Sequence, residues 1–228
     1  MFHSLRSAPA LILLSLLTAC TVQQADRRDD APPFLSLLTS SSSSSPSSSP
    51  ARTQDARALM RRGTVLGMGS MNAPALLLFT NHACAYCRRF QEEILPRLKE
   101  DFIDAGKVEL RTAILPLEKY PLSRREAAAL PCAGAQGKGQ EMHAALFRLD
   151  DHTEENLLAA AQALQLKMED FSACLASPDT AALAQAQEDL AAQLDVTLIP
   201  ALFLGEERWT GLPRYADLRG WVESGLDD

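Results

Sequence analysis

The chain has 228 residues, which is enough for one full domain with additional segments. Its 22 basic and 29 acidic residues give a net charge of −7, and no basic stripe runs along it, which argues against a nucleic-acid partner. Hydrophobic residues make up 46% of the chain, as is ordinary for a globular protein.

Residues 1–19 predict a signal peptide rather than a part of the fold. A weakly basic start is followed by about ten apolar residues, too few to span a bilayer. They end in Leu17-Thr18-Ala19-Cys20, which resembles a bacterial lipobox and predicts lipidation of Cys20. Thr21, rather than Asp, follows the cysteine, and this favours anchoring in the outer membrane, facing the periplasm. The alternative is ordinary secretion with an incidental Cys20, and either route leads to a compartment that permits disulfides.

Residues 20–57 predict a flexible tether. The run from Ser40 to Pro50 is almost entirely Ser and Pro and has no apolar periodicity. A flexible segment of this kind has a root-mean-square reach of roughly 30 Å. We expect it to hold the folded domain off the membrane while leaving the domain free to rotate towards partners.

Residues 58–121 predict the first half of an α/β domain. The apolar run from Ala75 to Thr80 is too short for a free-standing helix and predicts a buried strand. A helix is expected to begin at or near Cys84 and to run to about Ala105, and Pro96 could kink it. A second strand is predicted between Lys107 and Leu115, and the strand–helix–strand order implies a parallel pair.

Cys84 and Cys87 form a C-x-x-C pair at the start of that helix. Free N–H groups and the positive end of the helix dipole stabilise a thiolate at Cys84, and Arg88 and Arg89 add positive charge nearby. Cys87 lies one turn later, close enough to close a small disulfide ring. The pattern predicts an exposed nucleophile at Cys84 and a more buried resolving cysteine at Cys87. Zinc sites use the same spacing, but no second C-x-x-C or H-x3-H pair accompanies it, which favours redox chemistry.

Residues 122–194 have a helical period throughout and predict an all-helical insertion. Ser123 and Glu126 have the spacing of a capping box at the start of its first helix. Once the lipobox cysteine is set aside, Cys132 and Cys174 remain, and we interpret them as a structural disulfide between two helices, with free buried thiols as the alternative. Further helices are expected over Gln140–Leu149, Thr153–Leu164, Met168–Leu175 and Pro178–Leu194.

Residues 195–228 predict the second half of the interrupted domain. The segment from Asp195 to Gly205 returns to strand, and Pro200 stands at its opening, where a proline needs an edge or a special geometry. Arg208 to Thr210 predicts the last hairpin strand. A closing helix is expected from Leu212 to Ser224.

Taken in order, these pieces resemble the DsbA-like family of thiol-disulfide oxidoreductases, over about residues 64–226. That family has an α/β fold, the thioredoxin-like fold with an inserted all-helical subdomain, and the resemblance implies the same fold here. It rests on three motifs: Phe79-Thr80-x-x-x-Cys84-Ala85-Tyr86-Cys87, Cys132-Ala133-x-x-Gln136-Gly137-Lys138 leading to His143-x-x-Leu146-Phe147, and Val196-x-x-Ile199-Pro200-Ala201-x-Phe203.

The resemblance implies roles for individual residues. Cys84 resembles the family's nucleophile and Cys87 its resolving partner. Pro200 resembles the cis-proline that faces the redox pair, and Ile199 resembles the residue whose backbone hydrogen-bonds a bound substrate chain. The expected partners are proteins with thiols or disulfides and a membrane redox partner, with no cofactor and no metal ion.

Two positions depart from the family pattern. The dipeptide between the cysteines is Ala85-Tyr86, whereas many family oxidases have Pro first, and this dipeptide tunes the redox potential. Leu78 stands six residues before Cys84, where relatives carry a buried acid that assists proton transfer. His82 could supply that help or stabilise the thiolate, so we place it at the substrate site; an exposed loop histidine is the alternative.

The sequence therefore predicts a membrane-tethered periplasmic enzyme that exchanges disulfides with other proteins. One alternative is a lipoprotein that binds a soft metal, copper as Cu(I) or zinc, through Cys84, Cys87 and His82. The other is a non-catalytic thioredoxin-fold adaptor whose cysteine pair is structural.

Overall fold

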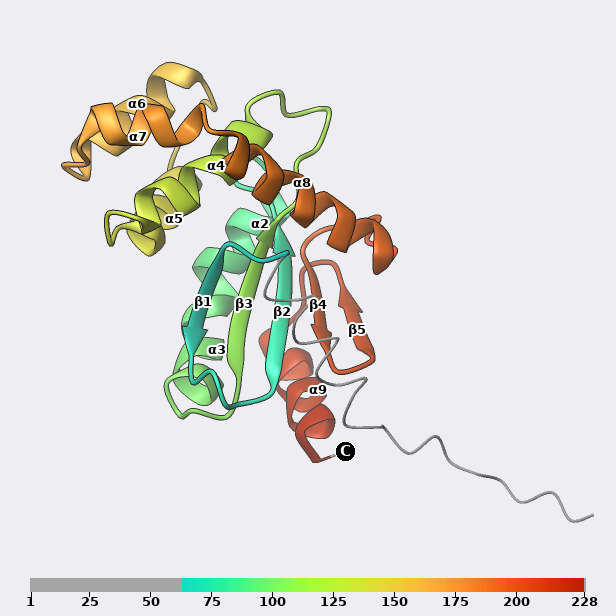
Figure 1. Ribbon diagram of the computed structural model, residues 1–228. Helices are drawn as coiled ribbons and strands as arrows, with labels where there is room; N and C mark the ends of the chain where they lie inside the picture. Colours follow the sequence, from blue (N-terminus) through green and yellow to red (C-terminus); the bar gives the residue numbers. More distant parts are fainter. Residues whose placement is uncertain (1–62, 228) are drawn as a thin grey trace, which may run out of the picture. The chain divides into compact units, whose positions relative to one another are not determined.

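In the part of the chain that the structure describes, five short strands form one mixed sheet (Figure 1). The computed structural model describes residues 63–227, so the predicted signal peptide, the lipidation site Cys20 and the tether lie outside the described residues. The strand order is β1-β3-β2-β4-β5, with β2 parallel to β3 and the other neighbours antiparallel. The strands are β1 (Leu66–Gly69), β2 (Ala75–Thr80), β3 (Glu109–Ile114), β4 (Ala201–Leu204) and β5 (Glu207–Thr210).

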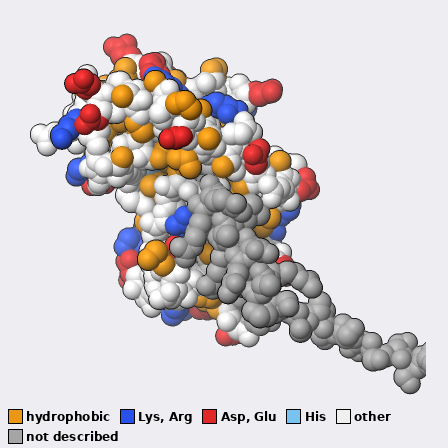
Figure 2. Space-filling model, viewed as in Figure 1, with side chains coloured by type: hydrophobic (Ala, Val, Ile, Leu, Met, Phe, Trp, Pro, Cys, Tyr) orange, Lys and Arg blue, Asp and Glu red, His pale blue; other side chains and the backbone are white. Residues whose placement is uncertain are grey.

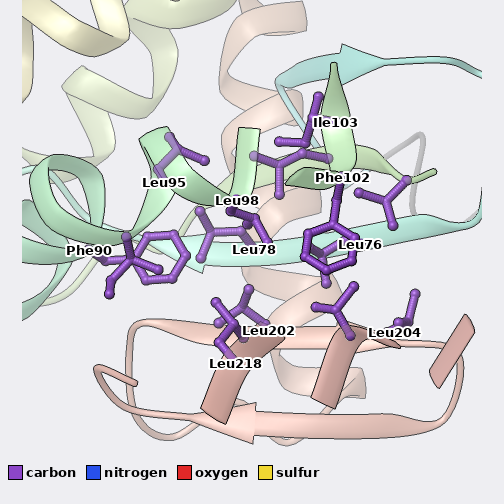
Figure 3. Close-up of a cluster of buried hydrophobic side chains, with 14 of the residues drawn as sticks. Leu76, Leu78, Phe90, Leu95, Leu98, Phe102, Ile103, Leu202, Leu204 and Leu218 are labelled. Atoms are coloured by element: carbon purple, nitrogen blue, oxygen red, sulfur yellow. The ribbon is translucent and has the colours of Figure 1, made fainter. Parts of the chain in front are cut away.

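The central strand β2 is buried on both faces, because its run of apolar residues sends alternate side chains to opposite sides of the sheet. Leu76 and Leu78 join a core under the helices that follow the cysteines and under α9 (Tyr215–Asp227), shown in Figure 3. Leu77 and Phe79 face the other way, towards α8 (Pro178–Gln193). Helices therefore cover both faces of the sheet.

The helix predicted to begin near Cys84 is present, but its backbone alternates between α and π geometry. It consists of α2 (Ala85–Arg89), the π segment η1 (Phe90–Ile94), α3 (Leu95–Leu98) and the π segment η2 (Lys99–Ile103). Pro96, which has no N–H to donate, stands in the first turn of α3 directly after a π segment. The wider π turn before α3 thus accommodates the missing N–H of the proline. The periodicity of the side chains does not reveal this π turn.

The predicted helical insertion is observed between β3 and β4. Its helices, except α8, pack around a core that also includes Ile114 of β3, whereas α8 packs against the sheet. Figure 1 shows these helices gathered beyond one end of the sheet, with α8 crossing that end towards the side of β5. The predicted capping box is wrong: Leu122 occupies the cap position of α4, and Ser123 bonds the Leu117 backbone. The helices are α4 (Ser123–Gly134), α5 (Gly139–Phe147), α6 (Glu154–Ala163), α7 (Met168–Leu175) and α8.

The closing helix α9 begins three residues later than predicted. Pro213 disfavours helical geometry at the residue before it, Leu212, so the helix starts only at Tyr215. Across the described residues, no helix combines the length and the apolar character needed to cross a membrane. On the face shown in Figure 2, acidic and basic side chains are interspersed with hydrophobic ones.

Candidate redox site

A tight loop after β2 places Cys84 at the head of α2. The loop is held by Asn81, whose side chain donates to the Leu115 carbonyl at 2.9 Å and accepts from the Ala83 N–H at 2.9 Å. Cys84 is the N-cap residue of α2 and has an extended backbone (φ −87°, ψ 118°). Its carbonyl accepts the Arg88 N–H at 2.9 Å. The first helical amides are therefore free to face the Cys84 sulfur.

The Cys84 thiol is acidic. A hydrogen bond from the Cys87 thiol is the main cause that lowers the pKa of Cys84 to about 6, and burial opposes this shift. The backbone N–H groups of Cys87 and Tyr86 and the charge of Lys119 also lower the pKa. The expected contribution of Arg88 is not observed, because its guanidinium donates to the Leu149 carbonyl at 2.6 Å. At neutral pH the Cys84 side chain is therefore mainly a thiolate.

Cys87 has the opposite character. Its side chain is fully buried, and the hydrogen bond to Cys84, followed by burial, raises the pKa of the Cys87 thiol far above its usual range. The Thr80 hydroxyl and the Asn81 backbone N–H oppose this rise by hydrogen bonding. Both cysteines are reduced in the structure. Cys84 is buried too, with 8% of its surface accessible, so the prediction of an exposed nucleophile is wrong. The pair thus combines an ionised sulfur with a protonated, more deeply buried one.

Residues from three other parts of the chain surround the sulfurs. Phe147 of α5 shares a buried cluster with the two cysteines, and the partly buried Tyr120 and Ile199 pack against this cluster. The Ile199–Pro200 peptide bond is cis, and Pro200 is buried. Within residues 63–227 the backbone N–H and carbonyl of Ile199 form no hydrogen bond. The predicted neighbours of the redox pair are therefore together at one site.

His82 does not lie where a bound substrate would touch it, and this corrects its assignment to the substrate surface. Its side chain is fully buried, with Nε2 at 3.0 Å from His143 Nδ1 and Nδ1 at 3.3 Å from Glu126 Oε2. The alternative of an exposed loop histidine is wrong for the same reason. Sequence reasoning missed that Glu126 is a buried partner of His82, because its spacing from Ser123 had suggested a cap instead.

Leu78, at the position where relatives carry a buried acid, lies in the apolar core as the sequence indicates. The insertion supplies a buried carboxylate at Glu126 of α4. Burial opposes its ionisation, but hydrogen bonding and charge attraction from His82 and His152 hold its pKa below the usual value. An ionised group is thus kept in the interior by two imidazoles.

The insertion also contains the second cysteine pair. Cys132 of α4 and Cys174 of α7 form a disulfide, with their Cα atoms 5.6 Å apart. The Thr180 hydroxyl lies 3.8 Å from one sulfur and 3.5 Å from the other. The bridge links two helices, as the structural interpretation expects, and it belongs to the insertion core rather than to the cluster around Cys84.

A metal site has little support in the geometry. Within residues 63–227 no group of three or more His, Cys, Asp or Glu side chains is placed to hold a metal ion. Both ring nitrogens of His82 are directed at side chains of the insertion, His143 and Glu126, so neither is available to join Cys84 and Cys87 around a soft ion.

Comparison with known proteins agrees with this arrangement. No curated protein matched the chain in sequence. Among solved structures, oxidised BdbD from Bacillus subtilis aligns over 73% of this chain and 95% of its own, with a TM-score of 0.65 and 21% identity. A thioredoxin-like oxidoreductase from Silicibacter pomeroyi aligns over 72% of this chain and 92% of its own, with a TM-score of 0.64 and 22% identity. The catalytic domain of Proteus mirabilis ScsC aligns over 77% of this chain and 97% of its own, with a TM-score of 0.63 and 19% identity.

These similarities confirm the predicted thioredoxin-like α/β fold with a helical insertion, of the kind found in DsbA-like proteins. A family model described as thioredoxin matches residues 61–224, which is more than half of the chain. The chain therefore belongs to the thioredoxin family.

Proposed function

We propose that the protein is a thiol-disulfide oxidoreductase that exchanges disulfides with protein substrates through Cys84 and Cys87. The observation that carries this proposal is the division of acidity within the pair. Cys84, with a pKa lowered to about 6 by the Cys87 thiol and the helix N–H groups, is ionised at neutral pH, whereas Cys87 keeps its proton. A structural cysteine pair has no need of such a thiolate.

The exchange follows from this asymmetry. In the reducing direction, the Cys84 thiolate attacks one sulfur of a substrate disulfide, forms a mixed disulfide and releases the first substrate thiolate. Cys87 then loses its proton and attacks the Cys84 sulfur, which breaks the mixed disulfide and releases the second substrate thiolate. The Cys84–Cys87 pair ends oxidised and the substrate disulfide ends reduced. The oxidising direction is the reverse of these steps, with a membrane redox partner closing the pair again.

A substrate polypeptide has a place to bind beside the sulfurs. The free backbone N–H and carbonyl of Ile199 can pair with an extended chain, as a sheet edge does. Tyr86, two residues after Cys84, has a side chain that is 61% exposed. Leu198, which precedes Ile199, is 66% exposed. These two side chains give the rim of the site an apolar character. A structural neighbour is itself described as a thioredoxin-like oxidoreductase, which agrees with this chemistry.

We place this activity in the periplasm, with the domain tethered through lipid on Cys20 to the membrane, the outer membrane being favoured. The support is the lipobox-like Leu17-Thr18-Ala19-Cys20 and the Ser/Pro-rich tether that follows it. The Cys132–Cys174 disulfide agrees with an oxidising compartment.

Insulin reduction by dithiothreitol tests the proposed activity. The wild type should accelerate it, and Cys84→Ser should abolish the acceleration because the attacking sulfur is lost. Cys87→Ser should also stop turnover, and it should accumulate mixed disulfides that a non-reducing gel reveals. A matched control is Cys132→Ser with Cys174→Ser, which also removes two sulfurs but leaves the site intact. Full turnover by Cys84→Ser would show that the proposed function is wrong.

A further inference from the structure

The segment that joins β3 to α4 carries a lysine to the edge of the redox site. Tyr120, a partly buried residue of this segment, packs against the cluster that contains Cys84 and Cys87. Lys119 precedes Tyr120 and is exposed, and its Nζ lies over the Tyr120 ring, 4.7 Å from the ring centroid. A positive charge is therefore held at the rim of the site, on a ring that itself packs against the sulfur cluster.

The charge of Lys119 is not engaged by an acidic group. Within residues 63–227 the Lys119 ammonium forms no ion pair and no hydrogen bond. The two basic side chains that follow Cys87 are engaged: Arg88 donates to the Leu149 carbonyl, and Arg89 forms an ion pair with Glu93. Lys119 is thus the free cation beside the redox pair among the residues that the structure describes there.

Glu118, the acidic neighbour of Lys119, has a basic group in its own surroundings. It lines a hollow together with Arg124 of α4 and Glu188 of α8. The charge of Lys119, in contrast, reaches the redox pair, because it helps to lower the pKa of Cys84. A charge that acts on the Cys84 sulfur can also act on the side chains of a substrate whose own sulfur has reached Cys84.

The geometry of an extended chain defines which substrate residues come near this charge. Alternate side chains of an extended chain face the same side, so the residues two positions before and after the substrate cysteine face the protein with it. They lie roughly 7 Å from the cysteine along the chain. Exposed charges interact over about 10 Å at an ionic strength of about 0.1 M, so these two positions lie within reach of a cation at the rim.

We propose that Lys119 is a specificity-determining residue that favours protein substrates with an acidic residue two positions before or after their reactive cysteine. The acidic side chain is attracted to the Lys119 ammonium, so the encounter and the attack by Cys84 become faster. The net charge of the chain is −7, which by itself would disfavour acidic substrates, so a preference for them requires a local cation. This inference rests on the proposed function of the cysteine pair.

Two activated peptides test the proposal. Each has a central cysteine in a disulfide with pyridine-2-thiol, and they differ only in carrying Glu or Lys two positions from the cysteine on both sides, with Gly elsewhere. The Cys84 thiolate of the reduced protein attacks the peptide sulfur, the disulfide breaks, and pyridine-2-thione leaves with the electron pair. Its absorbance gives the rate constant of attack at about pH 8, where Cys84 is ionised.

The wild type should attack the Glu peptide at least about threefold faster than the Lys peptide at low ionic strength, in keeping with the small attraction between exposed charges. About 0.5 M salt should remove most of this difference. Lys119→Gln should lose the preference, and Lys119→Glu should reverse it. Each ratio compares two peptides on one protein, so any change in the reactivity of Cys84 itself cancels.

Lys107→Gln is the matched control. Lys107 is also exposed and also lies over an aromatic ring, that of Phe102, but Phe102 belongs to a different core cluster. This variant should keep the wild-type ratio. Equal rates for the two peptides with the wild type, or a preference that persists in Lys119→Gln, would overturn the inference and leave the proposed function standing. No attack on either peptide would instead refute the proposed function.

Discussion

Removal of the Cys132–Cys174 disulfide should cost stability without costing activity. The bridge joins α4 to α7 across a sequence separation of 42 residues. In the chain-entropy model a closed loop of this size restricts the unfolded state by about 4 kcal/mol. A domain of 150 to 250 residues loses roughly 2–4 °C of melting temperature per kcal/mol. Cys132→Ala with Cys174→Ala should therefore melt about 10 °C below the wild type.

Thermal unfolding followed by circular dichroism measures this difference, with Cys84 and Cys87 kept reduced in all samples. The control is Cys84→Ala with Cys87→Ala, which also deletes two buried sulfurs but removes no cross-link, because this pair is reduced in the structure. The control should melt within a few degrees of the wild type.

Insulin reduction completes the test. The Cys132/Cys174 double variant should turn over at the wild-type rate at a temperature where it is folded, because the bridge lies in the insertion core. An unchanged melting temperature together with lost turnover would refute the structural interpretation and make the bridge part of the redox machinery.

Three further predictions follow from the same residues. Ultraviolet absorbance of the thiolate should titrate with a midpoint near pH 6 for Cys84, because the Cys87 thiol lowers its pKa, and a midpoint near 8.5 would contradict this. Burial lowers the pKa of His143 and His82, so unfolding takes up protons below about pH 6.5. The free energy of unfolding should therefore fall below that pH, by up to about 1.4 kcal/mol per pH unit for each histidine. Denaturant unfolding measures it, and a free energy of unfolding that stays constant between pH 7 and pH 5 would refute the prediction. Cys20→Ser should move the protein from the membrane fraction to the soluble periplasm, and continued membrane association would count against lipid anchoring.

Much of the fold was predictable because it is encoded locally. The apolar run at β2 and the helical periodicity after residue 122 each belong to one segment, and α7 was predicted with its observed bounds, Met168–Leu175. The Cys84–Cys87 spacing and its place at a helix start are also local. The direction of the Cys84 pKa shift was predicted from that position, although its largest cause in the structure is the hydrogen bond from the Cys87 thiol.

Contacts between distant segments could not be predicted in the same way. Glu126 reaches His82 across 44 positions in the sequence, and its spacing from Ser123 offered a competing local explanation that the structure contradicts. Buried residues recur every three or four positions through the π segments on either side of α3, so the sequence pattern did not reveal them. The contribution of Lys119 at Cys84, in place of Arg88, depends on tertiary packing.

The central claim is that Cys84 and Cys87 form an exchangeable redox pair, and the reduction potential of this pair tests it most directly. The protein is equilibrated in glutathione buffers that span a series of reduction potentials, and its free thiols are then trapped by alkylation. Mass spectrometry reports the fraction of the protein that carries the Cys84–Cys87 disulfide. The ionised Cys84 stabilises the reduced state, so we expect a potential within the range of exchange proteins, about −120 to −270 mV. A potential below about −300 mV, as in structural disulfides, or no disulfide between these residues, would contradict the account.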